Sequence, residues 1–150
     1  MNEILENIEN VLCQVADLKY INENWGQLNF YGSEVPVQWP CALIRHTTAQ
    51  YSNIGKDRQA KPVNRQEGIL NIEITVAYLK LTNTSKRAPA LQKKQGFRIW
   101  ETVEKVHEVL QGFSAAANLG GLVRTNTNNV LRDDGVQEVR ITYTAGAHDC

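Results

Sequence analysis

The chain has 150 residues, 42% of them hydrophobic and 21% charged, and its acids and bases cancel to a formal net charge of zero. This length fits one domain over residues 1–150, and periodic apolar runs exclude disorder throughout the chain. The absence of any apolar run of about 20 residues argues against a membrane helix. The acidic start MNEILENIEN does not fit a signal peptide, so we expect assembly in a cytoplasm.

The first 45 residues predict one helix and one strand. Apolar side chains recur at spacings of three and four over residues 2–18, which predicts a helix with one buried face. A polar turn region follows. Residues 35–45 then alternate between apolar and polar, which predicts a strand. Pro36 and Pro40 cannot donate ladder hydrogen bonds, so this strand is expected to be an edge strand or to begin late.

The middle of the chain predicts a loop and a long strand. Residues 46–68 are polar with few apolar anchors, which predicts a long functional or mobile loop. Residues 69–81 predict the clearest strand, with Leu70, Ile72, Ile74, Val76 and Tyr78 on one face and Asn71, Glu73 and Thr75 on the other. At about 3.3 Å per residue this strand would span about 40 Å and protrude from a small sheet. A second basic loop is predicted over residues 82–92.

The last third predicts a helix and a hairpin. Residues 91–111 form a helical stripe that Gly112 is placed to stop. Two strands, 121–131 and 136–145, are joined by the turn Asp133-Asp134-Gly135, and the tail from Ala147 is expected to be mobile. The whole order predicts an α+β fold. It comprises a mostly antiparallel sheet of about four to five strands, two helices packed on one face, long loops and a protruding long strand.

The sequence offers no convincing catalytic or metal-binding group. The histidines, at positions 46, 107 and 148, fall in different elements and lack ligand spacing. Cys41 and His46 could be imagined as a nucleophile pair, but Cys41 shares the apolar parity of its strand. The odd count of three cysteines fits a reducing compartment. We therefore expect no catalytic residue, metal or cofactor.

Charge is segregated along the chain. Residues 1–34 carry six acids and one base, 45–98 carry eleven bases and three acids, and 99–150 carry seven acids and four bases. The basic residues of interest form two clusters: Lys56, Arg58, Lys61 and Arg65, and then Lys86, Arg87, Lys93 and Lys94.

Three interpretations of these clusters stay open. They could track nucleic-acid phosphates with nearby aromatic groups, although a pI near 6.8 argues against a dedicated binder. They could be a solvated face. Or acidic and basic surfaces of neighbouring copies could meet head to tail, which closes into a ring when the rotation allows it.

One stretch of the chain resembles a known family. Trp25-Gly26-Gln27-Leu28, followed by VPVQWPCALI over residues 35–44, resembles the front half of phage and prophage tail-terminator (tail-completion, lambda gpU-like) proteins. The order of the later elements is similar as well. The motif residues, expected to be structural, are Trp25, Gly26, Gln27, Pro36, Trp39 and Pro40.

The resemblance implies a function by assembly. Such a subunit forms a ring, commonly hexameric, at the head-proximal end of a virion tail, where it stops tube growth and docks to the head connector. Its partners would be copies of itself, the tail tube protein, the head-connector protein and DNA that passes through unread. One of the two basic clusters would then face the lumen or an acidic surface of the next ring. The alternatives are another head–tail connector or tail-tube-like subunit, and a small non-specific nucleic-acid-binding domain, with an enzyme last.

Overall fold

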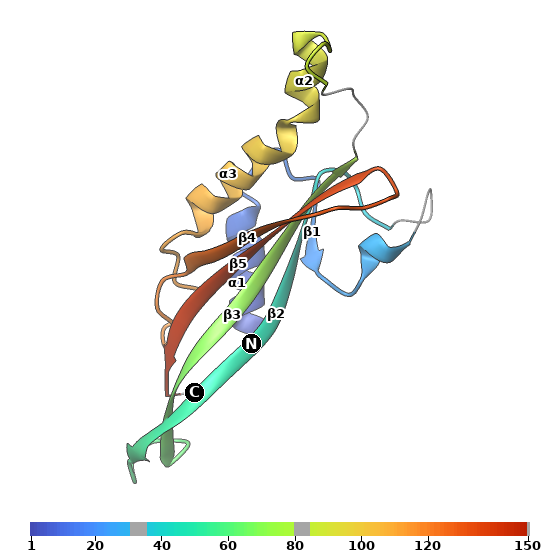
Figure 1. Cartoon of the computed structure of the whole chain (residues 1–150). Coiled ribbons are helices and arrows are strands. Elements are labelled where there is room, and N and C mark those ends of the chain that lie inside the picture. The colour runs from blue at the N-terminus through green and yellow to red at the C-terminus, as the bar shows by residue number, and fades with distance from the viewer. Residues whose placement is uncertain (31–35, 80–84, 150) are drawn as a thin grey trace.

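The protein is built on one five-stranded sheet, seen in a computed structural model that describes residues 1–30, 36–79 and 85–149 (Figure 1). The helices of this part are α1 (Asn2–Leu12), the 3-10 helix η1 (Gln27–Asn29), α2 (Ala90–Gly96) and α3 (Arg98–Leu110). The strands are β1 (Tyr20–Glu23), β2 (Cys41–Lys56), β3 (Asn64–Leu79), β4 (Val123–Val130) and β5 (Val136–His148). They are ordered β1-β2-β3-β5-β4, parallel between β1 and β2 and antiparallel elsewhere, so the predicted α+β class is confirmed.

The main core lies between the sheet and helices α1 and α3, which pack on one face as predicted. Ile8 of α1, Val106 of α3 and Ile74 of β3 are fully buried there. The alternation predicted for β3 is confirmed, because Leu70, Ile72, Ile74 and Val76 all belong to this core. A smaller cluster on the opposite face joins Leu28, Cys41, Leu43, Ala77 and Val136.

The first predicted helix is shorter than its apolar stripe, and the second is divided in two. Helix α1 ends at Leu12, and the chain continues in tight turns with bonds to the third residue back, which keep Val15 buried. The helix predicted over 91–111 is interrupted at Phe97. Gly96 precedes the break, where glycine weakens a helix, and Gln137 Nε2 donates to its carbonyl at 3.2 Å.

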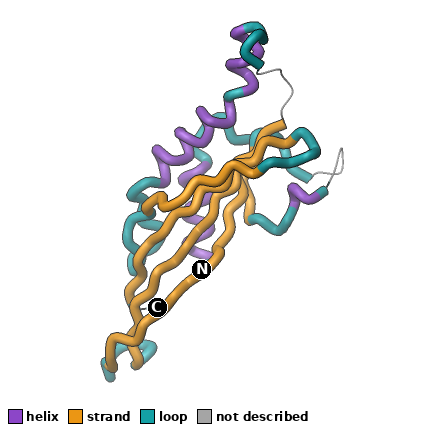
Figure 2. Tube along the Cα trace, viewed as in Figure 1, coloured by secondary structure: helices purple, strands orange, loops and turns teal. Residues whose placement is uncertain are grey.

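The prediction of a long loop over residues 46–68 is wrong, because this segment forms most of a β-hairpin (Figure 2). Strands β2 and β3 have 16 residues each and pair from Cys41 with Ala77 to Lys56 with Asn64. Strand β5 accompanies β3 only as far as the Glu67–His148 pair. Residues 53–66 therefore continue as a two-stranded extension, here called the arm.

Several local expectations need correction. Of the two alternatives predicted for the strand over 35–45, the late start is confirmed, because β2 begins at Cys41, and the edge position is wrong, because β2 lies between β1 and β3. Val35 lies outside the described residues. Strand β1, with four residues, fell in the predicted turn region. The tail is not loose: Ala147 and His148 belong to β5, and the Asp149 amide donates to the Gln66 carbonyl at 2.9 Å.

The predicted Asp133-Asp134-Gly135 turn is confirmed between β4 and β5, with Gly135 at φ 76°. Of the second predicted loop, 82–92, residues 85–89 precede α2, which begins at Ala90, and 82–84 lie outside the described residues. Gly112, at φ 78°, follows the end of α3, where the left-handed conformation favours glycine.

Candidate assembly surfaces

The first basic cluster lies on the arm. Lys56 ends β2, and Arg58 and Lys61 lie in the turn, all three exposed. Arg65, on β3, differs because its Nε lies 2.6 Å from Asp149 Oδ1. That hydrogen bond raises the pKa of Arg65 and lowers the pKa of Asp149. The arm tip, defined here as Lys56, Arg58 and Lys61, therefore carries the cations that remain available to a partner.

The second basic cluster lies at the opposite end of the molecule, beside α2 (Figure 1). Lys86 and Arg87 are exposed in the loop before α2, and Lys94 is exposed on that helix. The side chain of Lys93 lies outside the described residues. The fold thus separates the two clusters instead of joining them into one basic surface.

The residues of the family-like motif lie in the connection between β1 and β2, in two groups separated by positions outside the described residues. Gly26 has φ 94°, a left-handed conformation that favours glycine. Gln27 is fully buried: its Nε2 donates to the Glu23 carbonyl at 2.8 Å, and its Oε1 accepts from the Trp25 amide at 2.9 Å. Pro40 is buried, Trp39 is half-buried against the smaller apolar cluster, and Pro36 is exposed. Trp25 itself remains 57% exposed.

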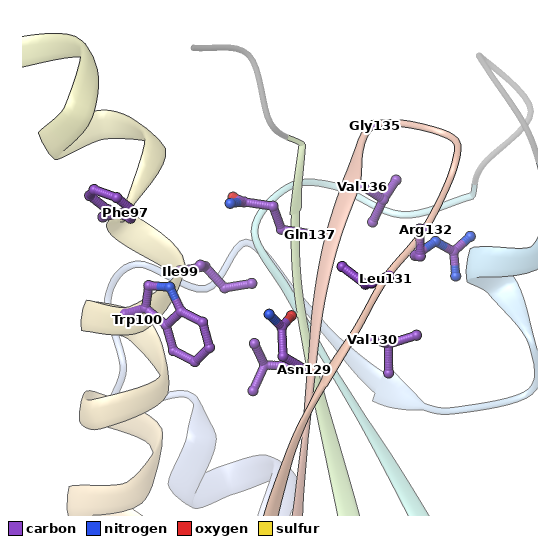
Figure 3. A pocket seen from close by; sticks show the side chains of 11 residues that line it. Phe97, Ile99, Trp100, Asn129, Val130, Leu131, Arg132, Gly135, Val136 and Gln137 are labelled. Atoms are coloured by element: carbon purple, nitrogen blue, oxygen red, sulfur yellow. The ribbon is translucent and has the colours of Figure 1, made fainter. Parts of the chain in front are cut away.

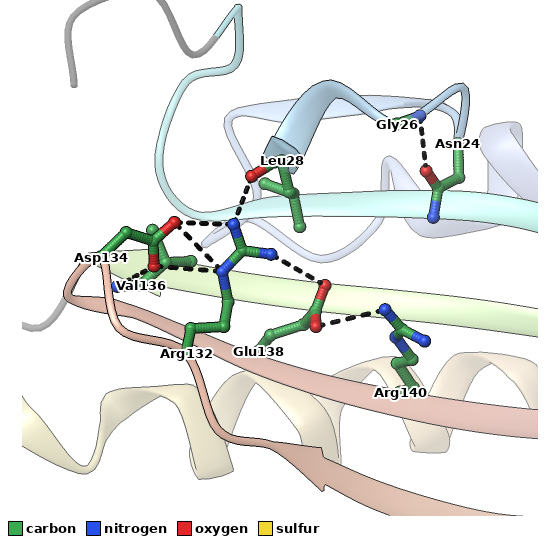
Figure 4. A network of polar contacts seen from close by, with 8 residues as sticks. All are labelled: Asn24, Gly26, Leu28, Arg132, Asp134, Val136, Glu138 and Arg140. Carbon is green, nitrogen blue, oxygen red and sulfur yellow. Dashed lines mark hydrogen bonds and ion pairs between the residues drawn. The ribbon is translucent and has the colours of Figure 1, made fainter. Parts of the chain in front are cut away.

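A charged network fastens this motif to the β4–β5 turn (Figure 4). Arg132 donates to the Leu28 carbonyl of η1, and its Nη2 lies 2.6 Å from Asp134 Oδ2. Its Nη1 lies 3.7 Å from Oε1 of Glu138, whose Oε2 lies 3.4 Å from Arg140 Nη2. We call Arg132, Asp134 and Glu138 the clamp.

The clamp was missed by sequence reasoning. Asp134 is explained locally by its turn, and Glu138 alternates with Val139 as a polar strand residue does. Yet Glu138 is only 2% exposed. Hydrogen bonding from Arg132 holds the pKa of Asp134 below its usual value, although burial opposes this shift. A basic and two acidic residues close to one tight turn were the available signal.

An apolar groove lies between the start of α3 and the β4–β5 hairpin (Figure 3). Its volume is about 330 Å³. Phe97 and Trp100 line it from the helix, and Leu131 and Val136 line it from the hairpin. Phe97, Trp100 and Leu131 are 48%, 40% and 94% exposed, so the groove continues into an apolar surface patch.

The chemistry of the candidate nucleophile is unfavourable. Burial raises the pKa of Cys41 to about 12, so its thiol stays protonated near neutral pH. Cys41 belongs to the smaller apolar cluster, whereas His46 pairs in register with Ile72 of the main core, so the two residues face opposite sides of the sheet.

Two further searches cover the described residues. In this part of the chain, no three His, Cys, Asp or Glu side chains converge into a group that could hold a metal ion. None of its helices is long and apolar enough to cross a membrane.

Comparison with known proteins gives a likeness of fold. No family model matches the sequence, and no curated protein matches it. Among solved structures, the chain is similar to a chain of the virion of a native gene transfer agent particle, with a TM-score of 0.51 and 9% identity. The alignment covers 97% of this chain and 91% of that chain. At this identity the similarity concerns the fold over nearly the whole length of both chains.

Proposed function

We propose that the protein is a structural subunit of a phage-type virion, and specifically a tail terminator that assembles as a ring. In this role it ends tail-tube growth at the head-proximal side, docks to the head connector and lets DNA pass without reading its sequence. It acts by contact geometry and not by bond-making chemistry. Its place is the virion tail, assembled in the host cytoplasm.

The fold likeness to a virion chain carries the proposal, because it extends over 97% of this sequence at a TM-score of 0.51. The sequence resemblance to tail terminators points in the same direction. A fold hosts many functions, so this argument rests on analogy and needs support from the surfaces themselves.

The arm supplies that support. A two-stranded hairpin is marginal on its own in water, and the arm has few side chains that pack on the body. Ile54 and Val63 on the arm are 44% and 46% exposed. A subunit that docks its arm on a neighbour would cover these side chains, as an assembly protein requires.

The proposal is tested by assembly with the tail-tube and connector subunits of the same particle. Tubes grown with the protein should have a capped end and a limited length, and electron microscopy should show a ring at one end. Tubes whose length and ends do not respond to the protein would contradict the terminator role.

The alternatives give different outcomes in the same experiments. A tail-tube-like subunit would polymerise into tubes by itself, and another connector component would bind the connector but leave tube length unchanged. A nucleic-acid-binding domain would shift DNA as a monomer in a salt-sensitive way. The separation of the two basic clusters to opposite ends does not favour that last role.

A further inference from the structure

The three cations of the arm tip outnumber the one carboxylate in the same turn, that of Asp57, so the tip has a net positive charge. Lys56, Arg58 and Lys61 lie more than 4.0 Å from every carboxylate oxygen of the described residues. Asp57, in the same turn, already accepts a hydrogen bond from the Gln59 amide at 2.9 Å. Exposed Ile54 and Val63 adjoin these cations in sequence. The arm thus presents an apolar segment with a basic end.

The exposed face of α3 carries negative charge. Along this helix an apolar side chain is followed by charged ones, as it is on the arm. Phe97, Glu101, Glu104 and Glu108 follow at spacings of four, three and four, so they share one stripe, and all are exposed. We call these four residues the α3 stripe. Lys105 lies within reach of it, but its Nζ is held 2.7 Å from Asp17 Oδ2. The three glutamates are therefore left without an ion pair in the described part of the chain.

We infer that the arm of one subunit docks on the α3 stripe of the next, with the basic arm tip against the glutamates and the apolar segment toward the groove of Figure 3. This inference rests on the proposed ring assembly and names the surfaces that join neighbouring copies. The contact is heterologous, because different surfaces meet on each subunit. Repetition of such a contact gives a ring when the rotation closes.

Geometry makes a second copy the occupant. The arm and the start of α3 lie at opposite ends of the molecule, so a subunit cannot place its arm in its own groove (Figure 1). From Phe97 to Glu108 the helix rises about 16 Å at 1.5 Å per residue. From residue 53 to residue 57 the extended arm covers about 13 Å at 3.3 Å per residue. The two surfaces are therefore of comparable length and of opposite charge.

Helix α1 is also acidic but fits less well. Glu3 and Glu6 are exposed on it, yet asparagines at positions 2 and 10 surround them where α3 has Phe97 and Trp100. Glu3 borders a pocket as well, lined among others by Met1, Ile4 and Leu70. Helix α1 presents two exposed glutamates beside it, whereas α3 presents three in one stripe, so the inference commits to α3 and keeps α1 as a control.

Charge reversal on each surface tests the contact with full-length protein. The arm-reversed variant is Lys56→Glu, Arg58→Glu and Lys61→Glu, and the stripe-reversed variant is Glu101→Lys, Glu104→Lys and Glu108→Lys. Each variant opposes like charges at every junction, so self-association measured by sedimentation velocity at low salt should weaken at least about tenfold. Wild-type association should itself weaken as salt is added.

A mixture gives the sharpest result. In an equimolar mixture of the two variants, each acidic arm meets a reversed stripe and each unaltered arm meets an unaltered stripe. Every junction of an alternating ring is then attractive, so association should return in the mixture although neither variant associates alone. The variant that carries all six substitutions should associate as the wild type does.

Matched controls separate this contact from a general effect of charge. Lys86→Glu, Arg87→Glu and Lys94→Glu make the same charge change at the other end and should leave self-association unchanged. Glu3→Lys, Glu6→Lys and Glu9→Lys on α1 should not restore association of the arm-reversed variant. Circular dichroism and urea unfolding of each variant confirm that its fold is retained.

The inference is overturned if either charge-reversed variant associates as the wild type does, or if the mixture of the two stays dissociated. It is also overturned if the α1 substitutions restore association of the arm-reversed variant, or if the wild type is monomeric up to about 1 mM. Tube capping, measured with the same variants, separates the proposed tail role from the proposed contact between the arm and the α3 stripe. If the variants cap tubes as the wild type does, the tail role stands and the arm contact fails. If arms and stripes associate but tubes are not capped, the contact stands and the tail role fails.

Discussion

The body of the sheet and the arm are made from the same two strands but are held together differently. In the body, β2 and β3 lie under α1 and α3, and residues such as Ile44 and Ile74 are fully buried. In the arm, Ile54 and Val63 remain about half exposed, and cross-strand bonds such as Gln66 Nε2 to Asn53 Oδ1, at 2.9 Å, lie in solvent. The buried core of the body therefore stabilises the isolated subunit, whereas the arm is stabilised mainly by the surface that it contacts.

The largest expected contrast comes from the same substitution in the two regions. Ile74→Ala leaves a cavity in the main core and should lower the free energy of unfolding by about 2–5 kcal/mol. Ile54→Ala on the arm should change it by less than about 0.5 kcal/mol. Urea unfolding measures both, at a concentration where the two variants share one association state. Equal losses would mean that the arm is part of the folding core.

Buried and exposed charges give the second contrast. Arg132→Met removes the counter-ion of Asp134 and one of the two arginines beside Glu138, whose side chain is 3% exposed, and should cost about 3 kcal/mol. Arg58→Met at the exposed arm tip should have no measurable effect on unfolding. Adding Glu138→Gln to Arg132→Met should recover part of the loss, since a neutral amide costs less to bury than an unpaired carboxylate. A negligible effect of Arg132→Met would show that the clamp does not stabilise the body.

This contrast also explains what the sequence could predict. Alternation marks a strand when one face is buried, so Leu70, Ile72 and Ile74 revealed β3 in the body. Between residues 46 and 68 most side chains face solvent on both sides, so no pattern marked the arm as a hairpin. The Asp133-Asp134-Gly135 turn was predictable because its chemistry is local.

The residues of the candidate surfaces also divide into those that the local sequence could predict and those that depend on the path of the whole chain. The basic clusters were visible as composition, but their separation to opposite ends depends on the path of the chain. The clamp was hidden because Arg132 reaches Leu28, more than 100 residues earlier, and no local pattern encodes a contact of that range. The α3 stripe could be read as a row of glutamates, whereas its junction with an apolar groove required the β4–β5 hairpin to be in place.

The junction between body and arm is tested at Gly68. A Cβ there would lie 2.6 Å from Tyr51 Cδ1 and 3.1 Å from the Gln50 carbonyl oxygen. Gly68→Ala should therefore displace the Tyr51 ring and cost about 1 kcal/mol. The double variant Tyr51→Ala, Gly68→Ala removes the close contact, so its loss should be smaller than the sum of the two single losses. Additive losses in urea unfolding would mean that the ring does not press on this position.

The smallest effect is a difference in pH dependence between two ion-paired aspartates, Asp134 in the body and Asp149 at the base of the arm. Hydrogen bonds from Arg132 and Arg65 respectively lower their pKa values in the folded state below the ordinary value of 3.8. The unfolded chain then binds protons first, so each pair stabilises the protein above about pH 4, and this contribution is lost as pH falls through the lowered pKa.

The exposed fractions of the two carboxylates, 8% for Asp134 and 53% for Asp149, decide how they differ. Salt screens an exposed pair far more than a covered one. Melting temperatures measured from pH 5 to pH 2.5 should therefore fall less steeply in Asp134→Asn than in the wild type, at low and at high salt. Asp149→Asn should differ from the wild type only at low salt. If both variants lost their difference at high salt, the clamp would be as open to solvent as the arm, and the contrast between the two regions would not extend to their charges.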